Sequence, residues 1–422
     1  MGAAEKQTLF STTLGCVADF QNGGAWKESE YVDSGVPVTR VTNCQSGTVD
    51  LSGCKYLSFS SAKKYERHQL IKGDLIVATV GSHPTQPGSV VGRTSTVPES
   101  ASGSLLNQNA VRLRAKSGLL DQRYLTYLAS SKEFRDYIIA HARGAASQVR
   151  MSIELLRDMP LLLPPLPTQQ LVASFLSVYD DLIENNTRRI EILEEMARRL
   201  YEEWFVQFRF PGHEGVEFKE SELGLIPEGW VVSCLGDIAE EIREAVHPSS
   251  VSPDTPYIGL EHLPRRSITL REWGSADSVS SGKLFFRRGD VLFGKIRPYF
   301  HKVVIAPFSG ICSSDTILIR PKKDNFLGVV LCCSSSDKFV DYATQTSNGT
   351  KMPRADWKVL KNYPVLIPSD GILSDFNSFV LGVVGQARNL MLKNVNLRAQ
   401  RDLLLPKLIS GEIDVSDIPM PT

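Results

Sequence analysis

The longest regular pattern of apolar positions lies near the middle of the chain, in residues 163–205. Pro164, Pro165 and Pro167 open it, and no further glycine or proline occurs before Pro211. Inside it, seam positions recur at alternating steps of four and three, which is typical of a coiled-coil helix. They are Val172, Leu176, Tyr179, Ile183, Asn186, Ile190, Leu193, Ala197, Leu200 and Trp204. A helix of about 40 residues, about 60 Å long, cannot bury this seam alone, so the pattern predicts a partner.

The predicted partner is a second helix over residues 373–409. Moving 204 residues along the chain from the first seam gives Phe376, Val380, Val383, Ala387, Leu390, Asn394, Leu397, Arg401, Leu404 and Leu408, of which eight are apolar. Asn186 interrupts the first seam and Asn394 the second, and a polar break of this kind can fix the register of a helix pair. If the two halves of the chain are related by a pseudo-twofold axis, the helices run antiparallel. The seams alone also fit a parallel pair.

Before each long helix the pattern changes to short strands. Residues 36–42, 74–80, 89–97 and 109–115 alternate or bunch β-branched side chains between glycine, serine and proline, which predicts strands. Residues 121–142 then carry an apolar face at helical spacing and predict one helix. The pattern predicts an α+β domain.

The strand-rich segment is repeated after Pro211. Residues 35–43, 70–80, 108–116 and 144–164 align with residues 255–263, 285–295, 314–322 and 348–368. Within the second of these pairs, a shift of one residue matches Gly73-Asp74 with Gly289-Asp290, and both dipeptides are typical of a turn that enters a strand. We predict two homologous strand-rich domains, at 1–162 and 209–368, separated by two long helices forming an antiparallel coiled coil, at 163–208 and 369–422.

Charge is informative only locally. Lysine plus arginine and aspartate plus glutamate both number 47, so the net charge indicates no partner. Residues 263–302, however, hold nine basic side chains against three acidic ones, and such a patch can attract DNA. On the central helix, Glu184, Glu191, Glu194, Glu195, Glu202 and Glu203 alternate with Arg188, Arg189, Arg198 and Arg199, which is typical of a solvated face.

Several functional classes find no support in the sequence. No Gly-x-Gly and no phosphate-binding loop occurs, so no nucleotide or S-adenosylmethionine site is predicted. The seven histidines and seven cysteines show no zinc-binding spacing, and we expect the cysteines to be buried thiols in a reducing compartment. With neither a signal peptide nor an apolar run of membrane-spanning length, the sequence predicts a non-catalytic cytoplasmic protein without cofactor or metal and without membrane contact.

Three segments carry a resemblance to a known family. They are PLLLPPLPTQQLVASFLSVYDDLIENNTRRIEILEEMARRLYEEWF from Pro160, KNYPVLIPSDGILSDF from Lys361 and LLLPKLISGEIDV from Leu403. Together they resemble the specificity subunit of bacterial Type I restriction-modification enzymes, over essentially the whole chain.

The resemblance implies a reader of double-stranded DNA with a bipartite target. Each strand-rich domain would be a target-recognition domain for one half-site, and the paired helices would act as a ruler between the half-sites. The helices would also dock two modification subunits, which bind S-adenosylmethionine and methylate adenine, with motor-nuclease restriction subunits as possible further partners. The family's recognition domains vary widely, so the resemblance does not assign individual contacts.

Candidate DNA contacts are polar residues in loops beside the predicted strands. Amide side chains can pair with adenine, whereas arginine and lysine side chains can pair with guanine or with phosphate. In the first domain the candidates are Thr79, Ser82, His83, Thr85, Gln86, Arg93, Gln108, Asn109, Arg143, Ser147, Gln148 and Arg150. In the second they are Lys295, Arg297, Tyr299, His301, Lys302, Ser313, Ser314, Asn348, Thr350, Lys351 and Arg354. Arg297 or Lys295 could read a guanine edge, whereas Lys351 and Arg354 suit phosphate.

Two alternatives remain open from the sequence. Each candidate contact could be an ordinary solvated loop residue, and the chain could be a scaffold of two globular domains on a coiled coil that binds no DNA. Trp204, Phe205, Phe208 and Phe210 crowd the end of the central helix and could form domain core or a docking patch. We favour core for this aromatic cluster.

Overall fold

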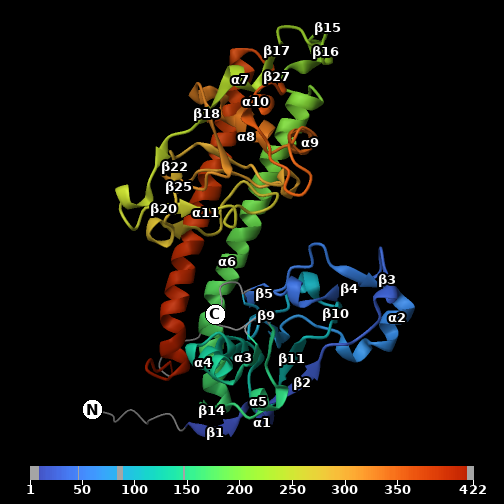
Figure 1. Ribbon diagram of the computed structural model, residues 1–422, viewed down its shortest axis with the longest axis vertical. Coiled ribbons are helices and arrows are strands. Elements are labelled where there is room, and N and C mark those ends of the chain that lie inside the picture. The colour runs from blue at the N-terminus through green and yellow to red at the C-terminus, as the bar shows by residue number, and fades with distance from the viewer. Residues whose placement is uncertain (1–8, 46, 83–88, 146–147, 416–422) are drawn as a thin grey trace. The chain divides into compact units, whose positions relative to one another are not determined.

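A computed structural model describes residues 9–45, 47–82, 89–145 and 148–415. By internal contacts the chain divides into two compact units. The first unit consists of Met1–Asp181 and Arg398–Thr422, and the second of Leu182–Leu397. Each unit contains one strand-rich domain and part of each long helix (Figure 1).

Both predicted long helices are present. Helix α6 spans Leu166–Tyr201 and continues as a π-helical turn over Glu202–Val206, and α11 spans Asp370–Ile409. Gln169 holds the beginning of α6: its side chain is fully buried, donates to the carbonyl of Pro164 (2.9 Å) and accepts from the amide of Asp121 (3.0 Å). The proline-rich entry is thus joined to the first strand-rich domain.

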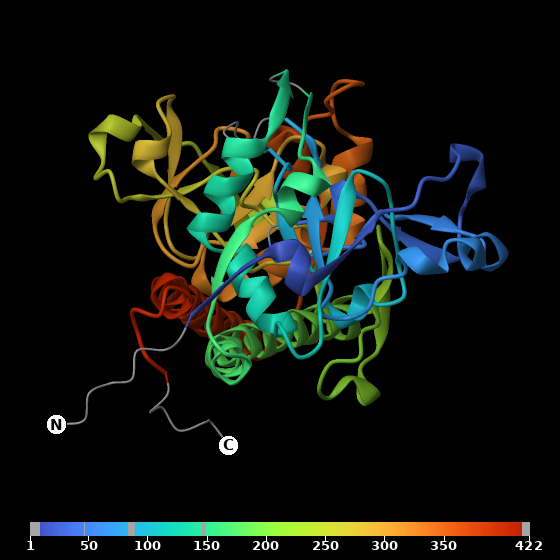
Figure 2. The same cartoon turned by 90° about the horizontal axis from the view of Figure 1, so that it is seen from below.

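In the second unit the two helix segments run antiparallel and lie side by side in both views (Figure 1, Figure 2). Asn186 Nδ2 donates to Asn394 Oδ1 at 2.9 Å, while the ring of Phe205 packs edge-on against Phe376 with centroids 4.7 Å apart. The residue number rises along one helix as it falls along the other. The parallel arrangement that the seam alone allowed is therefore excluded for this unit.

In the first unit the remaining helix segments share a core with the first domain. Val172 and Leu176 of α6 are buried in one cluster with Leu405 and Leu408 of α11. Arg401, the charged exception in the second seam, donates to Asp180 at 2.5 Å. Among the seam residues, Ile183, Ile190, Val380, Val383 and Leu390 are buried, and Tyr179, Leu193, Leu200, Leu397 and Leu404 are partly buried.

The first domain is built on two main sheets. The larger has the order β2 (Ala18–Asn22), β11 (Ala110–Ala115), β7 (Leu75–Ala78), β9 (Thr94–Thr96) and β5 (Gly47–Thr48). The second has the order β10 (Leu105–Leu106), β4 (Val36–Thr39), β6 (Lys55–Leu57) and β3 (Tyr31–Val32). A smaller sheet joins β12 (Arg143–Ala145), β13 (Gln148–Arg150) and β8 (Val80–Gly81), and β1 (Phe10–Thr13) pairs with β14 (Pro160–Leu163).

Among the described residues of this domain, the α-helices that accompany these sheets are α1 (Leu14–Val17), α2 (Phe59–Lys64), α3 (Gln122–Ala129), α4 (Lys132–His141) and α5 (Ile153–Arg157). The single helix that the sequence predicted over residues 121–142 is two helices. Ser131 caps α4, because its hydroxyl accepts from the amide of Phe134 at 3.2 Å. A serine side chain that bonds to the backbone in this way starts a new helix.

The second domain repeats this plan. One sheet has the order β18 (Ala239–Ile242), β26 (Thr316–Pro321), β23 (Val291–Gly294) and β24 (Val303–Ile305). The other has the order β19 (Ala245–Val246), β22 (Lys283–Phe286), β25 (Gly310–Cys312), β20 (Pro256–Ile258) and β21 (Gly274–Ser275). Two further pairs are β15 (Phe218–Ser221) with β16 (Gly224–Pro227) and β17 (Val231–Cys234) with β27 (Pro364–Ile367), and the helices are α7 (Leu235–Ile238), α8 (Leu327–Ser334), α9 (Asp337–Gln345) and α10 (Trp357–Leu360).

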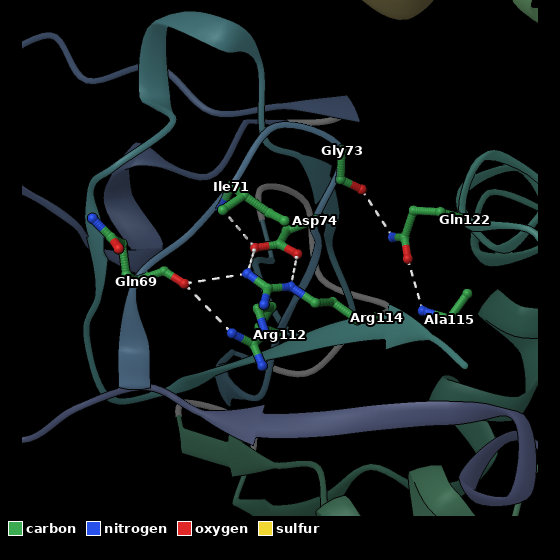
Figure 3. A network of polar contacts seen from close by, with 8 residues as sticks. All are labelled: Gln69, Ile71, Gly73, Asp74, Arg112, Arg114, Ala115 and Gln122. Atoms are coloured by element: carbon green, nitrogen blue, oxygen red, sulfur yellow. Dashed lines mark hydrogen bonds and ion pairs between the residues drawn. The ribbon is translucent and has the colours of Figure 1, made fainter. Parts of the chain in front are cut away.

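A buried ion pair supports the same strand in each domain. In the first domain the Asp74 carboxylate accepts from Arg114 at 2.5 and 2.9 Å and from the amide of Ile71 at 2.8 Å (Figure 3). In the second, Asp290 accepts from Arg320 twice at 2.7 Å and from the amide of Arg287 at 2.7 Å. Asp74 and Asp290 are nearly inaccessible, at 1% and 2% exposure, so both are structural.

The glycine before each aspartate makes the tight turn possible. Gly73 and Gly289 have φ of 85° and 92°, a left-handed conformation that side chains with a Cβ avoid. In the first domain, Gln122 also donates to the carbonyl of Gly73 (2.8 Å) and accepts from the amide of Ala115 (2.7 Å), as Figure 3 shows. The Gly-Asp pairs are strand-entry turns, as the sequence predicted.

The aromatic cluster at the end of α6 belongs to the core. Phe205 and Phe210 are 5% and 3% exposed, and both pack on the buried Trp230, with ring centroids 5.4 and 5.2 Å apart. Trp204 and Phe208 are partly buried against the same cluster. The core interpretation of these side chains is therefore confirmed.

Candidate nucleic-acid interface

Three loops of the second domain converge just after strand β23. The amide of Lys295 donates to the carbonyl of Asp315 (2.9 Å), and the carbonyl of Lys295 accepts from the amide of Ala355 (2.9 Å). Asn348 and Arg354 exchange two backbone hydrogen bonds, at 3.0 and 2.9 Å. Backbone pairing therefore gathers candidate residues from three distant parts of the sequence into one place.

The first domain has the same convergence after strand β7. The amide of Thr79 donates to the carbonyl of Asn109 (2.8 Å), and the carbonyl of Thr79 accepts from the amide of Met151 (2.9 Å). Arg150 pairs with Val80 on one side and with Arg143 on the other. The backbone positions of Thr79, Asn109 and Arg150 thus correspond to those of Lys295, Asp315 and Arg354.

We call these two sets of three loops the first and second loop frames. The first comprises residues 79–82, 108–109 and 143–151, and the second comprises residues 295–302, 313–315 and 348–355. Only their described residues are considered, since His83, Thr85, Gln86 and Ser147 lie outside the described residues, as does the side chain of Gln148.

The second loop frame presents both exposed cations and aromatic surface. Ser314, Asn348, Thr350, Lys351 and Arg354 are exposed, and Tyr299 is 51% exposed. The Arg354 guanidinium lies 3.8 Å from the Asp315 carboxylate. An exposed pair at this distance contributes little stability, so Arg354 can exchange Asp315 for a phosphate at small cost.

Arg297 is held in an unusual position within this frame. Its φ of 50° is left-handed, and its amide donates to the carbonyl of Pro353 at 2.8 Å. The guanidinium lies 5.9 Å from the centre of the Phe300 ring, which Arg265 covers at 4.2 Å. Its buried Nε has no hydrogen-bond partner within the part of the chain that the structure describes. A residue in a rare backbone conformation with an unmatched donor is typical of a functional position.

His301 and Lys302 point to internal partners. His301 is only 7% exposed, its Nε2 donates to the carbonyl of Ser335 (2.8 Å), and burial lowers its pKa. Lys302 donates to the carbonyl of Leu260, and burial lowers the pKa of its ammonium group. The loop position of both residues predicted exposed side chains. In the structure both side chains make hydrogen bonds inside the domain.

The first loop frame is exposed chiefly at four candidates, Gln108, Asn109, Arg143 and Arg150. Asn109 has a left-handed φ of 76°. Thr79 is 7% exposed, and Ser82 is partly buried. Arg93 donates to the carbonyls of Cys44 and Ser89, both at 3.1 Å, so its guanidinium braces two loops of the domain.

The structure also shows features that the sequence did not single out. Phe300 was missed as the platform under Arg265 and Arg297, although an aromatic residue between basic ones was the available signal. On α6, Leu182, Ile192 and Met196 are 47%, 53% and 44% exposed, so the outer face of this helix carries apolar side chains among its charges.

Glu194 corrects the prediction of a uniformly solvated charged face. This carboxylate is 6% exposed and accepts from the Ser267 hydroxyl (2.9 Å) and the Ile268 amide (3.1 Å). Burial raises its pKa. Glu195, by contrast, pairs on the surface with both Arg198 and Arg199.

Within the described residues, no group of three or more histidine, cysteine, aspartate or glutamate side chains is arranged to hold a metal ion. The cysteines are unbridged; Cys44, Cys312, Cys332 and Cys333 are buried, and Cys16 is exposed. Of the helices in the described ranges, none combines the length and the apolar character needed to cross a membrane.

Comparisons with known proteins agree with the repeated architecture. The family model for the Type I restriction modification DNA specificity domain matches residues 11–195 and again residues 227–372. The chain is 26% identical over 328 residues to the Type I restriction enzyme MjaIX specificity subunit of Methanocaldococcus jannaschii, covering 74% of this chain and 73% of that protein. It is 23% identical over 410 residues to the HindI specificity subunit of Haemophilus influenzae, covering 81% and 87%.

Among solved structures, the S subunit of a Type I restriction-modification system from M. genitalium has a similar fold. The TM-score is 0.55 with 14% sequence identity, and the match covers 97% of this chain and 98% of that one. Since the two family matches together cover most of the chain, one in each half, this protein belongs to the Type I restriction-modification DNA specificity family.

Proposed function

We propose that this chain reads a bipartite DNA target, with one half-site bound by each loop frame. The observation that carries this proposal is that the two frames share a backbone arrangement but carry different side chains. Thr79 corresponds to Lys295, and Asn109 corresponds to Asp315. A common frame with different donors and acceptors suits recognition of two different short sequences.

Within the second frame, Arg297 and Lys295 are the candidates for a guanine edge, which offers two acceptors in the major groove. Lys351, Arg354 and Thr350 suit phosphate, because they are exposed and lie on one loop. In the first frame Gln108 and Asn109 suit adenine, and Arg143 and Arg150 suit phosphate.

The paired helices are proposed to set the spacing between the half-sites. Helix α6 has 36 residues, about 54 Å of helix axis, and half-sites one turn of DNA apart are separated by about 34 Å. We further propose that the exposed apolar side chains of Leu182, Ile192 and Met196 help to dock the modification subunits. Charged residues flank them, which would keep this surface soluble before assembly.

The chemistry is proposed to reside on partner subunits. The modification subunits would bind S-adenosylmethionine and methylate adenine, and restriction subunits would add motor and nuclease activity. The sequence of this chain has no Gly-x-Gly and no phosphate-binding loop, which supports a recognition role without catalysis.

The direct test is to purify the chain with its modification subunits and to map the methylated adenines they produce. The proposal expects modification at a two-part site with a fixed gap. Methylation at one contiguous site, or none above background, would contradict it.

The alternative is a scaffold that binds no DNA. The salt dependence of DNA affinity distinguishes a DNA reader from such a scaffold. Contacts to several phosphates release counterions, so the affinity for target DNA should fall steeply as salt rises from about 50 to 200 mM. A fluorescence-anisotropy titration of the complex measures this slope. A scaffold would show no salt-sensitive binding to any DNA.

A further inference from the structure

The second unit contains an apolar cavity beside helix α11. Its volume is about 120 Å³, and its lining comes from both the strand-rich domain and the helix. The domain contributes Leu270, Ile305 and Ala306, and α11 contributes Val384 and Met391. An engineered apolar cavity of about 150 Å³ can hold benzene, so this one has room for a single aliphatic side chain.

The helix side of the cavity is open because Gly385 lines it. A Cβ added at Gly385 would meet nothing within 4 Å, so the missing side chain leaves space and no clash. Leu381, one turn earlier on α11, lines the same cavity and is 41% exposed. A glycine in a helix interior is less favourable than an alanine. Packing does not require a glycine at position 385, so the empty space beside it points to a binding role for the cavity.

Two arginines lie in the lining of this apolar cavity. Arg288 and Arg388 belong to its lining, and Arg288 is exposed. Arg388 donates to the carbonyl of Pro307, which fixes its guanidinium at the rim. Between Asp375 and Asp402 the sequence of α11 has no acidic residue. The surface therefore complements an apolar side chain that is flanked by carboxylates.

The corresponding positions of the first half have the opposite chemistry. Subtracting the 204-residue repeat replaces Leu381 by Ser177, Gly385 by Asp181 and Arg388 by Glu184. The apolar and cationic character is therefore a property of the second half alone. A partner that docks on both halves would find this anchor on only one of them.

We propose that the cavity anchors one of the two modification subunits, which inserts an aliphatic side chain from an acidic segment between Arg288 and Arg388. This inference rests on the proposed function, because it takes the modification subunit as the partner. It adds that the two docking positions are unequal, with the tighter one on the second unit.

The test uses the purified full-length chain and the modification subunit, titrated by isothermal calorimetry and counted by native mass spectrometry. Gly385→Leu fills the cavity and is expected to weaken one of the two binding steps by about tenfold or more, leaving the other unchanged. Gly382→Leu is the matched control, since Gly382 lies on the same helix with free space around its Cβ but outside the cavity lining. Thermal unfolding confirms that both variants fold.

Arg288→Glu tests the charge, with Lys393→Glu, an exposed α11 lysine outside the lining, as control. The proposal expects the same binding step to weaken for Arg288→Glu alone. It is overturned if neither cavity variant changes subunit binding or if both steps weaken equally. It is also overturned if Arg288→Glu weakens DNA binding and leaves subunit binding intact, because the rim would then belong to a DNA surface.

The wild-type chain separates failure of this inference from failure of the proposed function. If it assembles with modification subunits and methylates DNA while Gly385→Leu does so with both affinities unchanged, only the cavity proposal falls. If the wild type binds no modification subunit, both fall together.

Discussion

The two strand-rich domains share the backbone arrangement of their loop frames but carry different side chains on them. Both bury an aspartate against an arginine on the neighbouring strand, and both gather three loops with the same backbone hydrogen bonds. On these equivalent frames, however, Thr79 occupies the position that corresponds to Lys295, and Asn109 occupies the position that corresponds to Asp315. The difference teaches that the interior pair maintains the frame, while the side chains on its loops are free to diverge.

The largest expected effect comes from breaking the frame itself. Asp290→Ala leaves Arg320 without its buried partner and should lower the free energy of unfolding by about 3–5 kcal/mol. Asp74→Ala should cost the first domain a similar amount, because Arg114 is paired in the same way. Hydrogen exchange followed separately over β11 and β26 measures each domain. If one variant costs less than about 1 kcal/mol, the frames are not equivalent.

A smaller effect is expected from a side chain on the second frame. Arg297→Ala should weaken recognition of one half-site by about 1–3 kcal/mol and leave the other half-site unchanged. Gel shifts with DNA altered in one half-site at a time measure this, and Lys219→Ala, on the β15 strand, serves as control. Equal weakening of both half-sites would make Arg297 a general phosphate contact or a folding residue.

The Asn186–Asn394 hydrogen bond tests how a polar contact contributes to the pairing of the two long helices. Asn186→Ala removes the donor to Asn394, but Asn394 keeps weaker contacts to Ile183 and Thr187, so we expect a loss of about 1 kcal/mol in urea unfolding. The double variant Asn186→Leu with Asn394→Leu should recover this loss, because no buried polar group is left unpaired. A double variant less stable than Asn186→Ala would show that the polar pair itself stabilises the helices.

The smallest expected effect is on pH dependence. Burial lowers the pKa of His301 in the folded state, whereas the unfolded side chain titrates near its ordinary value of about 6.5. Below that value the unfolded chain binds the extra proton, so stability is complete above about pH 6.5 and declines as pH falls toward the lowered folded value. His301→Gln should flatten this decline in urea unfolding between about pH 7 and 5. An unchanged slope would contradict the assignment.

The helices and the repeat could be predicted from sequence because they depend on local periodicity. The seam over residues 172–204 and its copy 204 residues later require no knowledge of tertiary structure. The break at Ser131 escaped prediction because the apolar spacing continues across it, while the cap depends on one hydroxyl bonding the Phe134 amide. Periodicity shows which face is apolar, and it does not show where the backbone changes direction.

The loops that form the candidate site could be predicted from the sequence, but the exposure of their individual side chains was harder to predict. The convergence of three loops follows from the order of the repeated strands. By contrast, the Arg93 guanidinium donates to the carbonyl of Cys44, 49 residues away in the sequence. The Glu194 carboxylate accepts from the hydroxyl of Ser267, 73 residues away. Exposure of a polar residue depends on such distant partners, which a pattern of neighbouring residues does not contain.

The division of the chain into units has a consequence for its synthesis. The second unit is one continuous segment, Leu182–Leu397, but the core of the first domain includes Leu405, Leu408 and Val415, which follow that segment. On the ribosome the first domain to be made therefore cannot complete its core until residues 405–415 have also emerged. The second unit can close earlier, although domains usually fold in order from the N-terminus. A chain that stops after Leu397 should keep a folded second unit and leave the first one open to proteolysis.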